Sequence, residues 1–177
     1  EATSPVTADV WAEHSIWVQD PQYALALKGG ITAFHILPGS ANLIGGRGVT
    51  VKNLQRNTIN SMKFPDAPHS LKMACGENPK RVYGNRQQAP STRMGNAAGY
   101  RKSWIQAEAY LSRLDEYEAK SDEAKEIGYA PQRDLEMDTL AGVLRGEILV
   151  HNHCYRAEEM ATMINIANEF NYKITAF

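Results

Sequence analysis

The sequence has 177 residues, a formal net charge of −1 and 43% hydrophobic residues, which suits one globular domain with an ordinary core. The near-neutral charge excludes the basic surface typical of nucleic-acid binding, so we expect no nucleic-acid partner. No apolar run approaches the roughly 18 residues of a membrane span, so we expect no membrane insertion.

The first residues of the chain bear on the compartment, and its two cysteines bear on disulfide bonding. The chain begins Glu1-Ala2-Thr3-Ser4-Pro5, without the charged and then apolar pattern of a signal segment. This start leaves the compartment open between the cytoplasm and the periplasm. The two cysteines, Cys75 and Cys154, are too few for a disulfide framework and are predicted to be free thiols, with a single bridge as the alternative.

The first half of the chain alternates short apolar runs with Gly and Pro turn residues. This pattern predicts a helix at 22–27 and strands at 31–37, 49–51 and 71–75. The stretch SANLIGGRG, residues 40–48, predicts a glycine-rich loop. Backbone N–H groups of such a loop can bind phosphate, but the stretch lacks the spacing of the known phosphate-binding motifs, which favours a flexible loop.

The second half is dominated by two helical patterns. Apolar residues recur at helical spacing from Tyr100 through Trp104, Ala107, Leu111 and Leu114 and predict a long amphipathic helix. The charged run that follows predicts a solvated continuation. A second helix is expected at 157–170, with Met160, Met163, Ile164 and Ala167 on its apolar face. Shorter elements are expected at 138–144, 148–151 and 174–177.

Strands that alternate with helices predict a parallel α/β sheet. In such a sheet the functional loops follow the carboxyl ends of the strands. The loops that meet this condition are 39–48, 76–81 and 153–156.

The motif LVHNHCYR, residues 149–156, carries the clearest chemical signal. Because side chains alternate along a strand, His151 and His153 share one face. Two imidazoles so placed can bind one metal ion, and zinc accepts imidazole nitrogen readily. The alternative is a pair of packed or half-exposed histidines without a ligand.

The segment LKMACGENPKR contributes a second group of candidates. Glu77 follows its strand and can complete a mixed nitrogen and oxygen site, or cap a helix or turn. Lys72 lies within the strand, where a buried ammonium needs a partner, although an edge-strand charge is the alternative. Cys75 and Cys154 are interpreted as small buried residues rather than nucleophiles, and His35 as a core histidine.

Four segments in this order, ALKGGITAFHILPGSANLIGGRG, LKMACGENPKRVYG, PSTRMGNAAGYR and ILVHNHCYRAEEM, closely resemble the metal-dependent amidohydrolase superfamily, in its branch related to imidazolonepropionase. The resemblance covers nearly the whole chain. It implies a TIM-like (β/α) barrel of which residues 1–177 form a single incomplete domain, roughly strands 2 to 6. Lys72 would lie on the fourth strand and His153 on the fifth.

The resemblance also implies a hydrolase that cleaves C–N bonds of a small-molecule amide with a metal-activated water. The expected cofactor is one or two divalent ions, commonly zinc. His153 matches the fifth-strand ligand and His151 is a second candidate; Lys72, if carboxylated, or Glu77 would supply the fourth-strand ligand. The residues expected to orient a substrate carboxylate are Asn78, Arg81 and Arg93.

The sequence departs from the superfamily pattern at both ends. It has no HxH pair before residue 151, and the sixth-strand histidine and eighth-strand aspartate that relatives use are absent. We therefore interpret the chain as a central fragment whose catalytic base lies outside it, and which alone binds metal poorly and turns over no substrate. Exposed strand edges would favour a homo-oligomer. The alternatives are a non-catalytic small-molecule or phosphate-binding module and a purely structural domain.

Overall fold

The computed structural model describes all residues from 1 to 177. Its helices are η1 (Ala12–Ser15), α1 (Gln22–Lys28), α2 (Ile59–Met62), α3 (Glu77–Gly84), α4 (Arg93–Glu118), α5 (Asp122–Ile127), α6 (Leu135–Leu144) and α7 (Ala157–Glu169). Its strands are β1 (Ala33–Ile36), β2 (Ile44–Lys52), β3 (Ser70–Ala74), β4 (Leu149–His153) and β5 (Ile174–Ala176). None of the helices has both the length and the apolar character of a membrane span.

The five strands form one sheet in the order β1-β2-β3-β4-β5. The pairs β3–β4 and β4–β5 are parallel, as predicted for βα units, whereas β1–β2 and β2–β3 are antiparallel. The expectation of a wholly parallel sheet was therefore wrong for its first two strands. Only short turns separate β1 from β2, and so short a connection suits an antiparallel pair. The mixed, curled sheet is consistent with part of a barrel.

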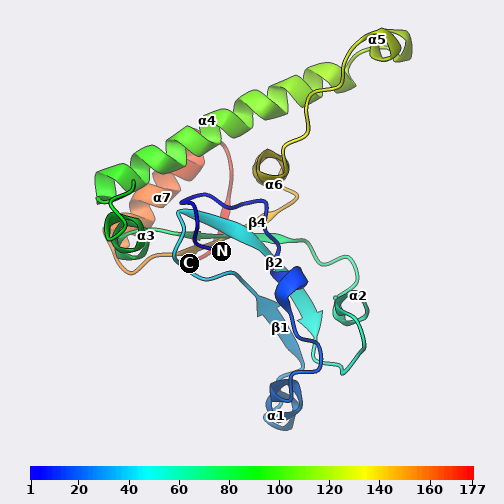
Figure 1. The fold of residues 1–177 in the computed structure, drawn as a ribbon, viewed down its shortest axis with the longest axis vertical. Coiled ribbons are helices and arrows are strands. Elements are labelled where there is room, and N and C mark those ends of the chain that lie inside the picture. The colour runs from blue at the N-terminus through cyan, green and yellow to red at the C-terminus, as the bar shows by residue number, and fades with distance from the viewer.

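Helices α4, α6 and α7 cover one face of the sheet (Figure 1). The apolar stripe of α4 packs there as predicted, with Tyr100, Trp104 and Ala107 buried. The core that they join includes Leu71 and Met73 of β3, Val150 of β4 and residues of α6 and α7. The opposite face of β3 and β4, here called the open face, carries the half-buried side chains Lys72, His151 and His153.

The apolar face of α7 is rotated from the predicted one. Met163 and Ala167 are buried as expected, but Ile164 is 45% exposed and Ile166 is fully buried. Glu159, one turn before Met163, is also buried. The rotation arises because a charged residue takes a place in the buried stripe, which periodicity of apolar residues cannot reveal.

The glycine-rich stretch is the largest departure from the sequence-based prediction. Residues 44–48 belong to strand β2 rather than to a loop. A Cβ on Gly46 would lie 2.1 Å from the carbonyl oxygen of Val10, and a Cβ on Gly48 would lie 2.5 Å from Leu37 Cδ2. The glycines therefore permit two other chain segments to pack closely against β2. This geometry argues against a phosphate-binding loop here.

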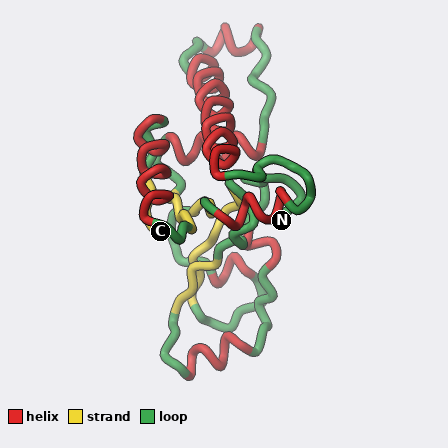
Figure 2. The backbone as a smooth tube through the Cα atoms, turned by 90° about the vertical axis from the view of Figure 1, so that its left-hand side faces the viewer, coloured by secondary structure: helices red, strands yellow, loops and turns green.

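The C-terminal part of α4, helix α5 and the return to α6 form a helical arm, residues 116–133. In both views the arm projects away from the sheet (Figures 1 and 2). Its side chains are mostly exposed, as predicted for the charged run, although Ile127 and Tyr129 are 87% and 97% exposed. At the base of the arm, Arg145 Nη2 lies 2.7 Å from Asp115 Oδ1.

Candidate active site

The open face of the sheet brings together three of the predicted site residues. Lys72 is paired in register with His151 on the neighbouring parallel strand, and Ala74 is paired with His153. All three polar side chains are half-buried, while the alternate residues Val150 and Asn152 are buried on the helix-covered face. Strand alternation therefore places the two imidazoles on one face, as predicted.

Lys72 is held by the segment that follows β1. Its Nζ donates to Ser40 Oγ at 2.6 Å and lies 3.4 Å from the carbonyl oxygen of Pro38. On the other side of Lys72, a Cβ on Gly45 of β2 would lie 3.2 Å from the Lys72 carbonyl oxygen, so the glycine permits a close approach of β2 to β3. Burial lowers the pKa of the Lys72 ammonium, since a low-dielectric environment disfavours the charged form. A neutral amine is the form that can carry a carboxyl group or bind a metal.

His35 is a residue of this face that sequence reasoning missed. Its side chain is not in the core; it is exposed, and its ring lies 4.5 Å from the His151 ring in an edge-to-face arrangement. Nε2 of His35 is 2.7 Å from Ser70 Oγ. The run ITAFHIL is mostly apolar and therefore predicts a buried strand. In the structure β1 is an edge strand, so His35 is not in the core.

The imidazoles of the open face are biased toward their neutral form. Burial, and then the charge of Lys72, lower the pKa of His151 and of His153. Burial and the neighbouring His151 lower the pKa of His35 in the same way. Neutral imidazole is the metal-binding form.

These shifts predict a loss of stability in mild acid. At His35, His69, His151 and His153 the folded-state pKa lies below the ordinary value, so the unfolded chain binds more protons as the pH falls through about 6.5. The free energy of unfolding should therefore decrease between about pH 7.5 and 5.5, in urea titrations at each pH. His151→Asn should weaken the dependence, because it removes one of these four groups. An unfolding midpoint that stays constant or rises on acidification contradicts this expectation.

The other predicted site residues come from helix α3 and from the first residue of α4. Asn78 Nδ2 lies 3.4 Å from His153 Nδ1. Glu77 is exposed in the first turn of α3, at the rim of a cavity of about 480 Å³ that Arg93 and Tyr155 also line. Arg81 is exposed on α3. The structure thus brings Asn78 to the histidines, and places Glu77 and Arg93 at a separate, neighbouring hollow.

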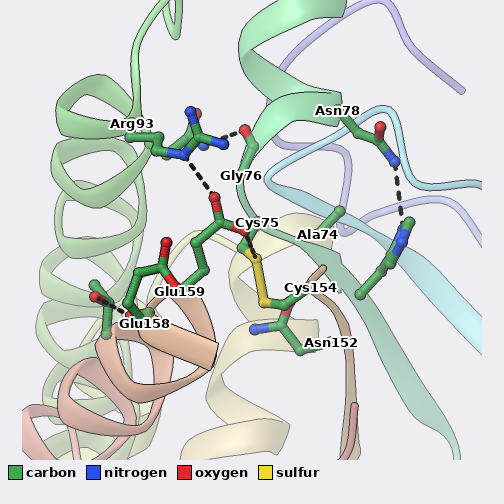
Figure 3. The surroundings of a disulfide bond; sticks show 12 residues. Ala74, Cys75, Gly76, Asn78, Arg93, Asn152, Cys154, Glu158 and Glu159 are labelled. Atoms are coloured by element: carbon green, nitrogen blue, oxygen red, sulfur yellow. Dashed lines mark hydrogen bonds and ion pairs between the residues drawn. A yellow bond between two sulfur atoms is a disulfide. The ribbon is translucent and has the colours of Figure 1, made fainter. Parts of the chain in front are cut away.

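Figure 3 shows that the two cysteines form a disulfide, so the prediction of free thiols was wrong. Each cysteine directly follows a strand, and the pairing of Ala74 with His153 sets the next residues side by side. Their Cα atoms are 5.2 Å apart, within the range that a disulfide spans. In addition, Cys75 N donates to the carbonyl oxygen of His153 at 2.8 Å. The disulfide therefore joins the ends of β3 and β4 beside the open face.

Comparisons with known proteins agree with this architecture. The amidohydrolase tasK of Hapsidospora irregularis is 35% identical over an alignment of 192 residues, which covers 100% of this chain and 19% of that protein. A crystal structure of an amidohydrolase from Thermotoga maritima MSB8 is 40% identical with a TM-score of 0.89, over 99% of this chain and 44% of that chain. No family model matches.

This chain is similar to amidohydrolases. The similarity extends over its whole length. The chain spans about a fifth of the curated amidohydrolase and less than half of the crystallised one. Much of each amidohydrolase relative is therefore made of sequence that has no counterpart here.

The donor set of the open face fits part of a metal site. Two imidazoles and a lysine of lowered pKa share the face, and these are groups that bind zinc directly or, for lysine, after carboxylation. However, no three His, Cys, Asp or Glu side chains converge so as to hold a metal ion. The face thus presents two imidazoles and one amine on the same side of two neighbouring strands.

Proposed function

We propose that the chain is part of a larger metal-dependent hydrolase that cleaves C–N bonds of a small-molecule amide, in the branch related to imidazolonepropionase. The observation that carries the proposal is the alignment of Lys72 with His151 on adjacent parallel strands, with His153 on the same face. Similarity to amidohydrolases over the whole chain supports the hydrolase class. Without a ligand, the half-burial of a lysine and two histidines on one face would cost desolvation free energy.

His151 and His153 would hold a divalent ion, with zinc expected, through ring nitrogens. Lys72, once carboxylated, would supply oxygen; Glu77 is the alternative oxygen ligand, although its position at the neighbouring hollow favours Lys72. When bound, the ion would polarise the scissile carbonyl and lower the pKa of a bound water. Burial lowers the pKa of Lys72, His151 and His153, which favours the neutral forms that bind a metal ion.

Substrate recognition would use residues of helix α3 and the first residue of α4. Asn78, Arg81 and Arg93 are the candidate residues for a substrate carboxylate. Arg93 Nε already lies 2.6 Å from Glu159 Oε1, so its free guanidinium nitrogens would make the contact. Cyclic amides, imidazolones, N-acyl amino acids and dipeptide-like amides all contain a C–N bond, and those that also carry a carboxylate suit this arrangement.

The remaining ligands and the catalytic base would come from sequence outside these 177 residues. The limited share of each relative that the chain spans supports this view. The isolated chain should therefore bind zinc weakly and show no turnover, whereas the longer protein should bind at least one equivalent tightly.

Metal titration tests the proposal directly. Zinc binding to the chain, measured by competition with a chromophoric chelator, should be at least about ten-fold weaker in His151→Asn and in His153→Asn than in the wild type. His14→Asn is the matched control, because His14 is exposed and its ion-pair partner is Glu13 rather than a residue of this face. Equal zinc affinity in the wild type and the two site variants would exclude these histidines as ligands. Elemental analysis of the longer protein identifies the ion.

A further inference from the structure

We propose that the two cysteines, once reduced, form a metal site with Glu159 for a thiophilic divalent ion such as Zn²⁺ or Cd²⁺. Cys75 and Cys154 belong to the hydrophobic core that α4, α6 and α7 share with the sheet. The histidines lie on the open face instead. The cysteine site is therefore separate from the metal site of the proposed function and does not rest on it.

Strand pairing holds the two sulfur atoms together whether or not they are bonded. Ala74 is paired with His153 on parallel strands, so Cys75 and Cys154 follow side by side. The hydrogen bond of 2.8 Å from Cys75 N to the carbonyl oxygen of His153 maintains this pairing without the disulfide. The Cα atoms are 5.2 Å apart, and two thiolates so close can reach one zinc ion at Zn–S distances of about 2.3 Å.

Glu159 supplies the third ligand atom. It lies in the first turn of α7 and is 8% exposed. Oε1 accepts from Arg93 Nε at 2.6 Å, whereas Oε2 lies 3.6 Å from Cys75 Sγ (Figure 3). A disulfide sulfur has no proton to donate, so Oε2 has no hydrogen-bond donor at this contact in the oxidised state. A metal ion bound to the reduced sulfur atoms would give this buried oxygen a partner.

The turn after Cys75 gives the carboxylate room to approach the strand end. Gly76 has φ +66°, and a Cβ there would lie 2.4 Å from Glu159 Oε2. Glycine therefore permits both the turn and the close approach. A divalent ion with two thiolates and a carboxylate keeps one negative charge, which the Arg93 guanidinium balances.

A cavity between α4 and α7 leads to the sulfur atoms. It has a volume of about 290 Å³, and its lining includes Cys75, Arg93, Asn96 and Glu159. The side-chain oxygen of Asn96, Oδ1, is buried without a hydrogen-bond partner. This oxygen can accept from a metal-bound water, which would be the fourth ligand of a tetrahedral ion. The cavity therefore offers both an entry path and room for the water.

The disulfide and the metal-bound state exclude each other. A dithiol reductant transfers two electrons and two protons to the disulfide and is itself oxidised to a disulfide. The divalent ion then displaces the two thiol protons and binds both thiolates. Disulfides persist in oxidising compartments and thiols in reducing ones, so the compartment determines which of the two states the protein adopts.

Titration of the reduced chain with Cd²⁺ tests the proposal, because thiolate ligands give a cadmium charge-transfer absorption in the ultraviolet that imidazoles do not. The chain is reduced with a dithiol, which is then removed without air. The reduced wild type should gain the absorption up to one equivalent of Cd²⁺. The oxidised wild type and the Cys75→Ser/Cys154→Ser variant should not gain it, whereas reduced His151→Asn should match the wild type. Cd²⁺ should also raise the urea midpoint of the reduced wild type but not that of the double variant.

Variants of the first turn of α7 test the third ligand. Glu159→Gln should weaken Cd²⁺ binding by at least about ten-fold, whereas Glu158→Gln should stay within about two-fold of the wild type. Glu158 is the matched control, because it is exposed and pairs with Arg156 at 3.1 Å. Glu159→Asp keeps the charge beside Arg93 but shortens the side chain, so it should also weaken binding and serves if Glu159→Gln does not fold.

Two results would overturn the proposal. One is a reduced wild type that gains no more charge-transfer absorption than the double cysteine variant. The other is wild-type Cd²⁺ affinity in a folded Glu159 variant, which would remove the carboxylate from the site.

Discussion

Removing the Cys75–Cys154 disulfide should lower the free energy of unfolding by about 2–4 kcal/mol. The bond closes a loop with a sequence separation of 79 residues, and so long a loop greatly restricts the unfolded chain. It also joins the ends of two strands that are already paired in the folded state. Urea unfolding with and without a dithiol reductant measures the effect as a shift of the midpoint.

The chain has only two cysteines, so a reductant acts on this bond alone. The Cys75→Ser/Cys154→Ser double variant should unfold at a lower urea concentration than the oxidised wild type. Its unfolding midpoint should not change when the reductant is added. Thiol counting under denaturing conditions gives the oxidation state of each sample. If the reductant shifts the wild type no more than it shifts the double variant, the disulfide contributes no stability.

Gly46→Ala should destabilise the fold by about 3 kcal/mol, combining overpacking with the loss of a backbone hydrogen bond. The new Cβ would lie 2.1 Å from the carbonyl oxygen of Val10, a backbone atom that cannot rotate away. That oxygen accepts from the N–H of Arg47 at 2.8 Å. Alanine would therefore push the N-terminal segment away from β2. Urea unfolding measures the loss of stability. A change in the fluorescence of Trp11, whose ring centroid lies 4.4 Å from Arg47 Cζ, reports the displacement.

Gly39→Ala is the control for this prediction. A Cβ at Gly39 meets no atom within 4 Å, and the substitution should change stability by less than about 0.5 kcal/mol. Equal stability of the Gly46→Ala and Gly39→Ala variants would mean that the N-terminal segment does not pack on β2 in solution.

Elements with a strong local pattern were predictable from the sequence, and those that depend on distant segments were not. The stripe from Tyr100 to Leu114 and the apolar runs of β3 and β4 carry their own periodicity. The glycines of β2 look like a loop by composition alone. Their role depends on Val10 and Leu37, which approach them from elsewhere in the chain. Local patterns contain no information about such approaches.

The candidate site shows the same division. Alternation along one strand placed His151 and His153 on a common face, and the resemblance to amidohydrolases singled out Lys72. The register that sets Lys72 opposite His151 comes from strand pairing and could not be read from either segment. The proximity of Cys75 and Cys154 follows from that same register. His35 lies on an edge strand, β1, whose apolar sequence predicts a buried strand instead.

The helical arm affects how the size of this molecule is measured. Helix α4 has 26 residues and is about 39 Å long at ~1.5 Å per residue, whereas a compact chain of this length has a radius of gyration of about 16 Å. A helix of this length that packs on the sheet at one end and leads into the projecting arm at the other raises hydrodynamic friction, so a monomer should elute early from a gel-filtration column calibrated with spherical standards. The apparent molecular mass from an early peak could then be mistaken for that of the expected homo-oligomer. Static light scattering measures molar mass independently of molecular shape and therefore distinguishes an extended monomer from a true dimer.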